Sequence, residues 1–306
     1  MAGWLKRWLR SKSSSDNLES RSSAGSFASW AGIVINLLLV VGKVTAGIFA
    51  GSVAVIADGL NNLMDALGAI ITLLGFKMAA KKADDEHPFG HGRYEYIAGL
   101  AVAVLVLVVG VELARSGITE ILDPSPVDFG TPIVIVLVIS VAVKSWMALF
   151  YRRFSKRIGS SALKAVSVDS RNDALATSAV FISALVSRYA GIELDGWAAL
   201  GVSLFILYNG IGLLKETISP LVGEAPSEEL VDYISEKITA HKQVLGIHDL
   251  IIHDYGPERR YVSAHVEMPS DEDPVITHDI IDSIERDFLE NDGIHLIIHV
   301  DPVAPE

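Results

Sequence analysis

Two pairs of oxygen-bearing side chains recur at the same spacing in two largely apolar segments. Asn61 and Asp65 lie four residues apart in ADGLNNLMD, and Asp169 and Asp173 lie four apart in VDSRND. Residues four apart share one face of a helix, so each pair presents two ligands to one side. An ionised side chain inside a spanning helix costs on the order of 2.5–3.5 kcal/mol, so these carboxylates need a compensating role. A bound cation supplies one, because carboxylate and amide oxygens suit hard divalent ions.

The two pairs also fall at the same expected depth in a bilayer. At about 1.5 Å per residue, Asn61 and Asp65 lie roughly 12–18 Å from one surface, and Asp169 and Asp173 lie roughly 11–17 Å from the other. Both pairs therefore meet near the midplane. Four ligands at one level predict a tetrahedral-type cation site.

Ion pairing within the membrane is the alternative to a metal site. Lys43 and Asp58 have matching expected depths, so an ion pair accounts for Asp58 as well as a metal does. Lys144 or Arg171 could neutralise one aspartate of the second pair. Pairing with bases does not explain why two i, i+4 pairs lie at one level.

Residues 81–100, KKADDEHPFGHGRYEYIAGL, contain a second set of metal-ligand residue types. Asp84, His87 and His91 offer one carboxylate and two imidazoles at spacings of three and four. These groups bind transition metals, so the loop is a candidate second cation site near the membrane surface. A loop that caps a helix and faces lipid headgroups is the alternative.

The elements that must position these residues are long apolar segments. Six are long enough to cross a hydrocarbon core of about 30 Å as helices: about 29–50, 53–79, 96–120, 131–152, 162–187 and 195–217. The loops after the second and fourth segments are basic, whereas the alternate loops are short or acidic. Because positive loops stay inside, both termini are expected in the cytoplasm. A Ser-rich run before the first segment reads as a linker.

Composition separates a membrane part from a soluble part. Half of the 306 residues are hydrophobic and yet 20% are charged. From residue 220 onward there are 20 acidic and 5 basic residues. Such a surface attracts cations and argues against a nucleic-acid partner, which requires basic side chains. The absence of cysteine leaves oxygen and imidazole as the only strong metal ligands.

Residues 220–306 are expected to form a small α+β domain. An amphipathic helix over 227–242 opens with SEEL, a good N-cap with an acidic first turn. HDLIIHDYG and YVSAHVEMP predict a hairpin, 275–291 a second helix, and GIHLIIHVD a last strand. The expected domains are a cytoplasmic N-terminal arm (1–28), a transmembrane domain of six helices (29–219) and an acidic cytoplasmic domain of order α-β-β-α-β (220–306).

Taken together, these features resemble the cation diffusion facilitator family of divalent-metal/proton antiporters. The resemblance covers nearly the whole chain through the six spans, the motifs ADGLNNLMD, VDSRND and HPFGHGRYEYIAGL, and an acidic, metallochaperone-like C-terminal domain. It implies a homodimer joined through that domain and the membrane region. It also implies a transport site at Asn61, Asp65, Asp169 and Asp173, a loop site at Asp84, His87 and His91, and cytoplasmic sites at His248, His265, His278, His299 and Asp301. For His241, His253 and His295, an ordinary surface position is favoured.

The departure from the family's zinc-transporting members is informative about the metal. Those members usually carry a His in the quartet, whereas all nine histidines here lie outside the predicted spans. The set Asn61, Asp65, Asp169 and Asp173 resembles that of the bacterial manganese-exporting branch. Oxygen ligands suit Mn²⁺, and removing imidazole gives up the advantage of Zn²⁺. Fe²⁺ or Zn²⁺/Cd²⁺ efflux by the same fold is the alternative.

The resulting hypothesis is an antiporter of the inner or plasma membrane. It would export Mn²⁺ as its substrate against inward-moving protons, with no prosthetic group and no enzymatic reaction. Since the quartet has no His, the protons would be carried by aspartates, whose burial and mutual repulsion favour proton uptake.

Two other classes remain as alternatives. Paired intramembrane aspartates also occur in aspartyl proteases, but such a site needs one close pair and leaves the loop and acidic domain unexplained. A metal sensor anchored in the membrane would bind metal through its tail without transporting it.

Overall fold

The computed structural model describes residues 14–50, 53–123, 131–190, 195–257 and 259–304. Some side chains within these ranges, those of Asp58 and Asn61 among them, lie outside the description. The chain forms two compact units. The helical unit comprises Ser22–Met78 and Tyr94–Ile218, and the mixed unit comprises Ala79–Arg93, Ser219–Glu306 and the described residues up to Arg21.

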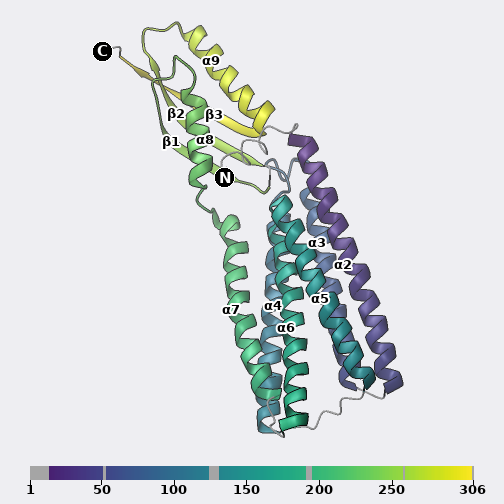
Figure 1. The fold of residues 1–306 in the computed structure, drawn as a ribbon. Coiled ribbons are helices and arrows are strands. Elements are labelled where there is room, and N and C mark those ends of the chain that lie inside the picture. Colours follow the sequence, from purple (N-terminus) through teal and green to yellow (C-terminus); the bar gives the residue numbers. More distant parts are fainter. Residues whose placement is uncertain (1–13, 51–52, 124–130, 191–194, 258, 305–306) are drawn as a thin grey trace. The chain divides into compact units, whose positions relative to one another are not determined.

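Six long helices agree with the six apolar segments expected from the sequence (Figure 1). They are α2 (Ser14–Ala50), α3 (Val53–Ala79), α4 (Tyr94–Leu122), α5 (Thr131–Ile158), α6 (Ser161–Ala190) and α7 (Asp195–Val222). By length and composition, five of them could cross a membrane among the described residues. The sixth, α6, which carries Asp169, Arg171 and Asp173, is not among the candidate spans found in the described residues.

The Ser-rich stretch expected to be a linker is instead the first part of α2, which begins at Ser14. Serine has an intermediate helix propensity, so a Ser-rich stretch can continue a helix. Its hydroxyl can donate to the carbonyl one turn earlier. Ser29 does so within this helix, donating to Gly25 O at 3.0 Å.

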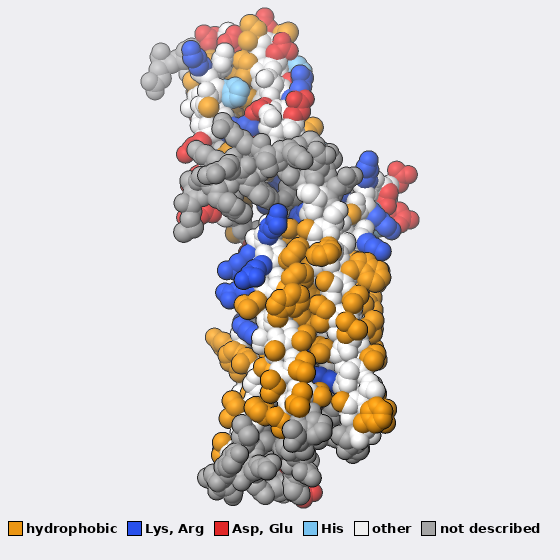
Figure 2. Space-filling view, turned by 45° about the vertical axis from the view of Figure 1, so that its right-hand side comes forward, with side chains coloured by type: hydrophobic (Ala, Val, Ile, Leu, Met, Phe, Trp, Pro, Cys, Tyr) orange, Lys and Arg blue, Asp and Glu red, His pale blue; other side chains and the backbone are white. Residues whose placement is uncertain are grey.

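All six helices contribute to one buried core in the helical unit. Its fully or nearly buried members are Ala28, Phe76, Val102, Ala103, Met147, Tyr151, Leu163, Ala165, Val166 and Leu213. Large apolar side chains also cover the outside, such as Leu38, Val108 and Leu204. Figure 2 shows this apolar surface, with Lys and Arg gathered toward one end of the helices. An apolar exterior of this extent is the surface expected of a protein in lipid.

Helices α4 and α7 approach closely at glycines. A Cβ added to Gly117 would lie 2.9 Å from the backbone nitrogen of Leu200 and 3.0 Å from the carbonyl of Gly196. Small residues that allow backbones to touch are a usual means of packing helices in membranes.

The mixed unit contains the expected order α-β-β-α-β. Its elements are α8 (Glu228–Thr239), β1 (Gly246–Asp254), β2 (Arg260–Pro269), α9 (Pro274–Asp287), a π turn η1 (Phe288–Asp292) and β3 (Ile294–Val303). The sheet order is β1-β2-β3, with β1 antiparallel and β3 parallel to β2. Ser227 caps α8 as expected, its side chain accepting a hydrogen bond from Leu230 N. The fold class, a helical membrane domain followed by a small α+β domain, is confirmed.

One β-bulge determines which residues of β1 share a face of the sheet. His248 is paired with His265, and His253 with Tyr261, so five steps along β1 match four along β2. Asp249 absorbs the extra residue with a φ of 49°. Successive strand residues alternate between faces, so without the bulge His248 and His253 would lie on opposite faces.

Phe288 anchors the core of the mixed unit, where it is fully buried beside Ile234, Ile284 and Leu296. We expect Phe288→Ala to lower the free energy of unfolding of this unit by roughly 3–5 kcal/mol, because it removes a large buried ring. Hydrogen exchange of the β2 and β3 backbone, followed by mass spectrometry, measures this loss. Leu289→Ala, at a side chain that is 46% exposed, is the matched control. Equal exchange in the two variants would contradict the prediction.

Candidate functional site

Three of the four predicted membrane ligands come together in the helical unit. Ligand oxygens of Asp65 on α3 and of Asp169 and Asp173 on α6 all lie within 4.8 Å of one another. The side chains of Asp65 and Asp173 are only 9% and 12% exposed. The fourth member, Asn61, has a side chain outside the described residues. We call the three carboxylates the aspartate cluster.

A buried lysine on α5 bridges the aspartate cluster. Lys144 Nζ lies 2.5 Å from Asp65 Oδ2 and 2.7 Å from Asp173 Oδ2. Its side chain is 3% exposed. One ammonium thus links α5 to both α3 and α6, and it offsets one of the three negative charges. From the sequence, Lys144 was a candidate partner for one aspartate of the second pair. In the structure it pairs with two aspartates, Asp65 and Asp173.

Other polar groups of the helical unit are also buried. The side chain of Lys43 on α2 is 3% exposed. The ion pair expected between Lys43 and Asp58 lies outside the described residues on the Asp58 side. Among the described side chains, the hydroxyls of Ser140 and Tyr151 on α5 are buried without a hydrogen-bond partner. Ser140 lies one helical turn before Lys144 and on the same face.

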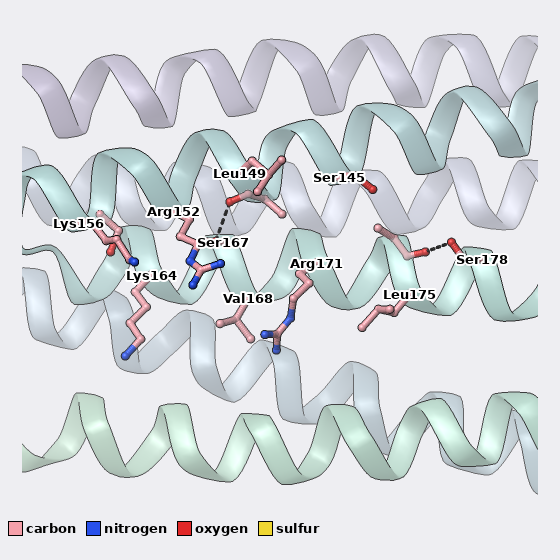
Figure 3. A pocket seen from close by; sticks show the side chains of 13 residues that line it. Ser145, Leu149, Arg152, Lys156, Lys164, Ser167, Val168, Arg171, Leu175 and Ser178 are labelled. Atoms are coloured by element: carbon pink, nitrogen blue, oxygen red, sulfur yellow. Dashed lines mark hydrogen bonds between the residues drawn. The ribbon is translucent and has the colours of Figure 1, made fainter.

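Arg171, the other candidate base, lies elsewhere. It lines a groove of about 680 Å³ along α5 and α6, shown in Figure 3, with Arg152, Lys156 and Lys164. The guanidinium carbon of Arg171 lies 5.7 Å from the ring centroid of Phe205 on α7. A groove lined by four positive side chains repels metal ions, and none of the aspartate cluster lines it. The groove therefore does not serve as a cation site.

The predicted loop residues also come together. His91 Nε2 lies 3.3 Å from Asp84 Oδ2, and the imidazole rings of His87 and His91 are 4.6 Å apart. His87 N donates a hydrogen bond of 2.7 Å to Asp84 Oδ1, which holds the pKa of Asp84 below its usual range. Asp84 thus stays ionised as a potential ligand. His91 is fixed by a 3.0 Å contact between its Nδ1 and Lys82 O.

The loop that carries these residues packs on the β1–β2 turn within the mixed unit. Phe89 stacks on Tyr255 at 4.3 Å and meets the edge of Tyr261 at 5.1 Å between ring centroids. Arg93 donates to Asp254 O at 2.8 Å, and Arg259 donates to Lys81 O at 2.7 Å. Aromatic and charge-assisted contacts hold the loop against the turn.

Four of the five predicted C-terminal residues form one cluster on the sheet. Asp301 Oδ2 lies 3.0 Å from both His248 Nε2 and His265 Nδ1, and Asp301 Oδ1 lies 3.4 Å from His299 Nε2. The hydrogen bond with His265 holds the pKa of Asp301 below its usual range. We call these four residues the sheet cluster.

His278 is the predicted residue that stands apart. It lies exposed on α9 and belongs to none of the groups of potential ligands found among the described residues. Sequence reasoning also missed Asp249, which joins His248 and His265 in one such group. The sequence feature that could have indicated it is the carboxylate directly after His248. In the structure, Asp249 Oδ2 lies 3.3 Å from His248 Nδ1. His295 is exposed, as expected, and its ring stacks on Tyr261 with 4.7 Å between ring centroids.

Phe89 provides a test of the loop contact. We expect Phe89→Ala to raise the hydrogen-exchange rate of residues 81–93 by roughly tenfold, because an aromatic contact of this kind contributes about 0.5–1.5 kcal/mol beyond its buried area. Exchange followed by mass spectrometry measures it. Phe89→Tyr, which keeps the stacked ring, should exchange like the wild type. Unchanged protection in Phe89→Ala would show that the ring does not hold the loop.

The fold and its carboxylate cluster define a multi-pass membrane protein equipped to handle cations. Comparison of the chain with family models gives two matches: the cation efflux transmembrane domain over residues 29–222, and the cation efflux protein cytoplasmic domain over residues 226–303. The chain belongs to the cation efflux family.

Relatives of this chain include proteins of archaea and bacteria. An uncharacterized transporter of Methanocaldococcus jannaschii is 28% identical over 272 residues, covering 89% of this chain and 96% of that protein. The cation-efflux pump FieF of Klebsiella pneumoniae is 30% identical over 268 residues, covering 87% and 88%. FieF of Escherichia coli is 29% identical over 270 residues, covering 88% and 89%.

Membership of this family fixes the general function. The protein is a cation efflux transporter with a cytoplasmic C-terminal domain, and it is not an enzyme. An intramembrane protease and a sensor without transport are therefore excluded.

Proposed function

We propose that this protein exports Mn²⁺ from the cytoplasm across the inner or plasma membrane in exchange for protons. The aspartate cluster carries the proposal: ligand oxygens of three carboxylates from α3 and α6 lie within 4.8 Å of one another in the membrane domain, close enough to bind one ion together. With the Asn61 oxygen they make an all-oxygen set of four. Binding one metal among them would relieve the repulsion between buried negative charges.

The choice of Mn²⁺ rests on what the set lacks. None of the nine histidines falls within the bounds of α2–α7. Nitrogen ligands favour Zn²⁺ and Fe²⁺ over Mn²⁺, whereas carboxylate and amide oxygens suit Mn²⁺. An all-oxygen site thus reduces the difference in affinity between Mn²⁺ and ions that prefer nitrogen. Transport of Fe²⁺, Zn²⁺ and Cd²⁺ should be measured beside that of Mn²⁺.

Protons can occupy the same oxygens as the metal. A carboxylate must be ionised to bind a cation, so metal binding and proton binding compete. We infer that a metal leaves the outward-facing site as Asp65, Asp169 and Asp173 take up protons. An inward proton gradient would then drive export.

The other two clusters would serve metal capture on the cytoplasmic side. We infer that Asp84, His87 and His91 bind one ion, and that the sheet cluster binds another, with His278 outside it. Mixed imidazole and carboxylate ligands of this kind hold transition metals. The acidic surface around them would raise the local concentration of cations. The match to the family's cytoplasmic domain supports a homodimer.

Asp169 gives the sharpest test of the membrane site, because Lys144 bonds to the other two aspartates. We expect Asp169→Asn to reduce Mn²⁺ transport by at least about 100-fold, since even residues that only orient a ligand change metal affinity by 10- to 100-fold. Uptake into proteoliposomes with and without a pH gradient measures it, and dissipating the gradient should stop uphill transport in the wild type. Glu112→Gln, at an exposed side chain of α4, is the control. Wild-type rates in Asp169→Asn would reject the site.

Asn61 tests the metal preference. We expect Asn61→His to shift the ratio of Zn²⁺ to Mn²⁺ transport toward Zn²⁺ by roughly tenfold, which corresponds to about 1.4 kcal/mol, because an imidazole favours Zn²⁺. Competition between the two ions in the same liposomes measures this ratio. Asn61→Asp, which keeps an oxygen ligand, is the control and should retain the preference for Mn²⁺. An unchanged ratio in Asn61→His would place selectivity in other contacts.

A further inference from the structure

The ammonium group of Lys144 contacts two of the three carboxylates that would bind a metal in the aspartate cluster. Its distances of 2.5 Å to Asp65 Oδ2 and 2.7 Å to Asp173 Oδ2 place it between two of the three carboxylates. Carboxylate oxygens bind divalent metals such as Zn²⁺ and Mg²⁺ at about 2.0–2.2 Å. A metal on those same oxygens would therefore lie within about 5 Å of the nitrogen.

Two cations this close together repel each other. The side chain of Lys144 is 3% exposed, so little water screens the repulsion. A metal would also draw on the same negative charge that holds the ammonium, and so weaken both contacts of Lys144. Displacement of the ammonium relieves this repulsion.

Lys144 has the freedom to leave. Its ammonium sits on a flexible four-carbon stem with three rotatable donors. The Ser140 hydroxyl, one turn away on the same helix, is buried without a hydrogen-bond partner among the described residues. A second acceptor is thus available within reach of the stem.

We propose that Lys144 is a built-in competitor of the transported metal, a tethered cation that fills the aspartate cluster when no metal is bound and is displaced when a metal binds. This inference rests on the proposed function, since it assumes that the aspartate cluster is the transport site. No proton transfer at Lys144 is involved, because the lysine remains an ammonium in both states.

Two consequences follow for transport. The empty carrier never holds three uncompensated carboxylates in the membrane, because Lys144 returns as the metal leaves. The competitor also lowers the apparent affinity for metal by the fraction of time that it leaves the cluster open. Weaker binding speeds metal release, so Lys144 lowers the affinity for metal and raises the rate of transport.

Lys144→Met is the direct test, since methionine is a flexible, unbranched side chain without charge. If the open form makes up about 1–10% of the wild type, the variant should bind Mn²⁺ about 10- to 100-fold more tightly. Titration of Mn²⁺ into the full-length protein in lipid nanodiscs measures the dissociation constant. Transport in proteoliposomes should show a lower KM together with a lower maximal rate.

Two variants control for charge and for folding. Lys144→Arg keeps a cation at the cluster and should bind Mn²⁺ with an affinity close to that of the wild type. Lys164→Met removes a lysine that pairs with Glu216 outside the cluster and should also leave the affinity unchanged. Equal or weaker Mn²⁺ binding by folded Lys144→Met would overturn the proposal.

A structure of the wild type with Mn²⁺ bound decides the matter without a variant. The Lys144 nitrogen should then lie beyond hydrogen-bond distance of Asp65 or Asp173, or of both. Mn²⁺ in the aspartate cluster with both Lys144 contacts intact would refute displacement. Failure of the proposed function looks different: Asp169→Asn would then leave Mn²⁺ binding and transport unchanged.

Discussion

The helical unit depends on compensation of negative charge in a place that water does not reach. Three carboxylates lie within 4.8 Å of one another, and one ammonium touches two of them. Carboxylates this close and this poorly hydrated repel one another, so in their ionised form they require a positive charge nearby. The same requirement that makes Lys144 necessary in the empty protein makes the cluster attractive to a divalent cation.

Helix geometry separates the two kinds of charge on α6. At about 100° per residue, Arg171 points roughly 200° away from both Asp169 and Asp173. Its guanidinium lines the groove along α5 and α6, while the aspartates meet Asp65 and Lys144. Helix α5 is fixed against α6 by the bond from Ser167 Oγ to Ala148 O, 2.8 Å long. This alternation explains how one helix carries an arginine close in sequence to the aspartate cluster without neutralising it.

In the mixed unit, imidazoles surround one carboxylate on the sheet and another in the loop of residues 81–93. Asp301 contacts His248, His265 and His299, and Asp84 contacts His87 and His91. Both carboxylates have a pKa below the usual range because hydrogen bonds favour their ionised form. The aromatic contact of Phe89 with Tyr255 and Tyr261 joins the loop to the hairpin. The mixed unit thus contains two defined groups of potential metal ligands.

The sequence by itself determined the six helices and the α-β-β-α-β order, because apolar length and periodicity are local properties. It also predicted that Asp65 meets Asp169 and Asp173, because their depth in the bilayer can be counted from the ends of the apolar segments. Only the tertiary structure decided that Lys144 of α5 meets Asp65 and Asp173, since contacts between helices depend on how the helices pack. It also decided that His248 shares a face with His265 and His299, through a bulge at Asp249 that the alternation of strand residues does not reveal. His278 remained outside the sheet cluster because its place on α9 depends on how helix and sheet pack.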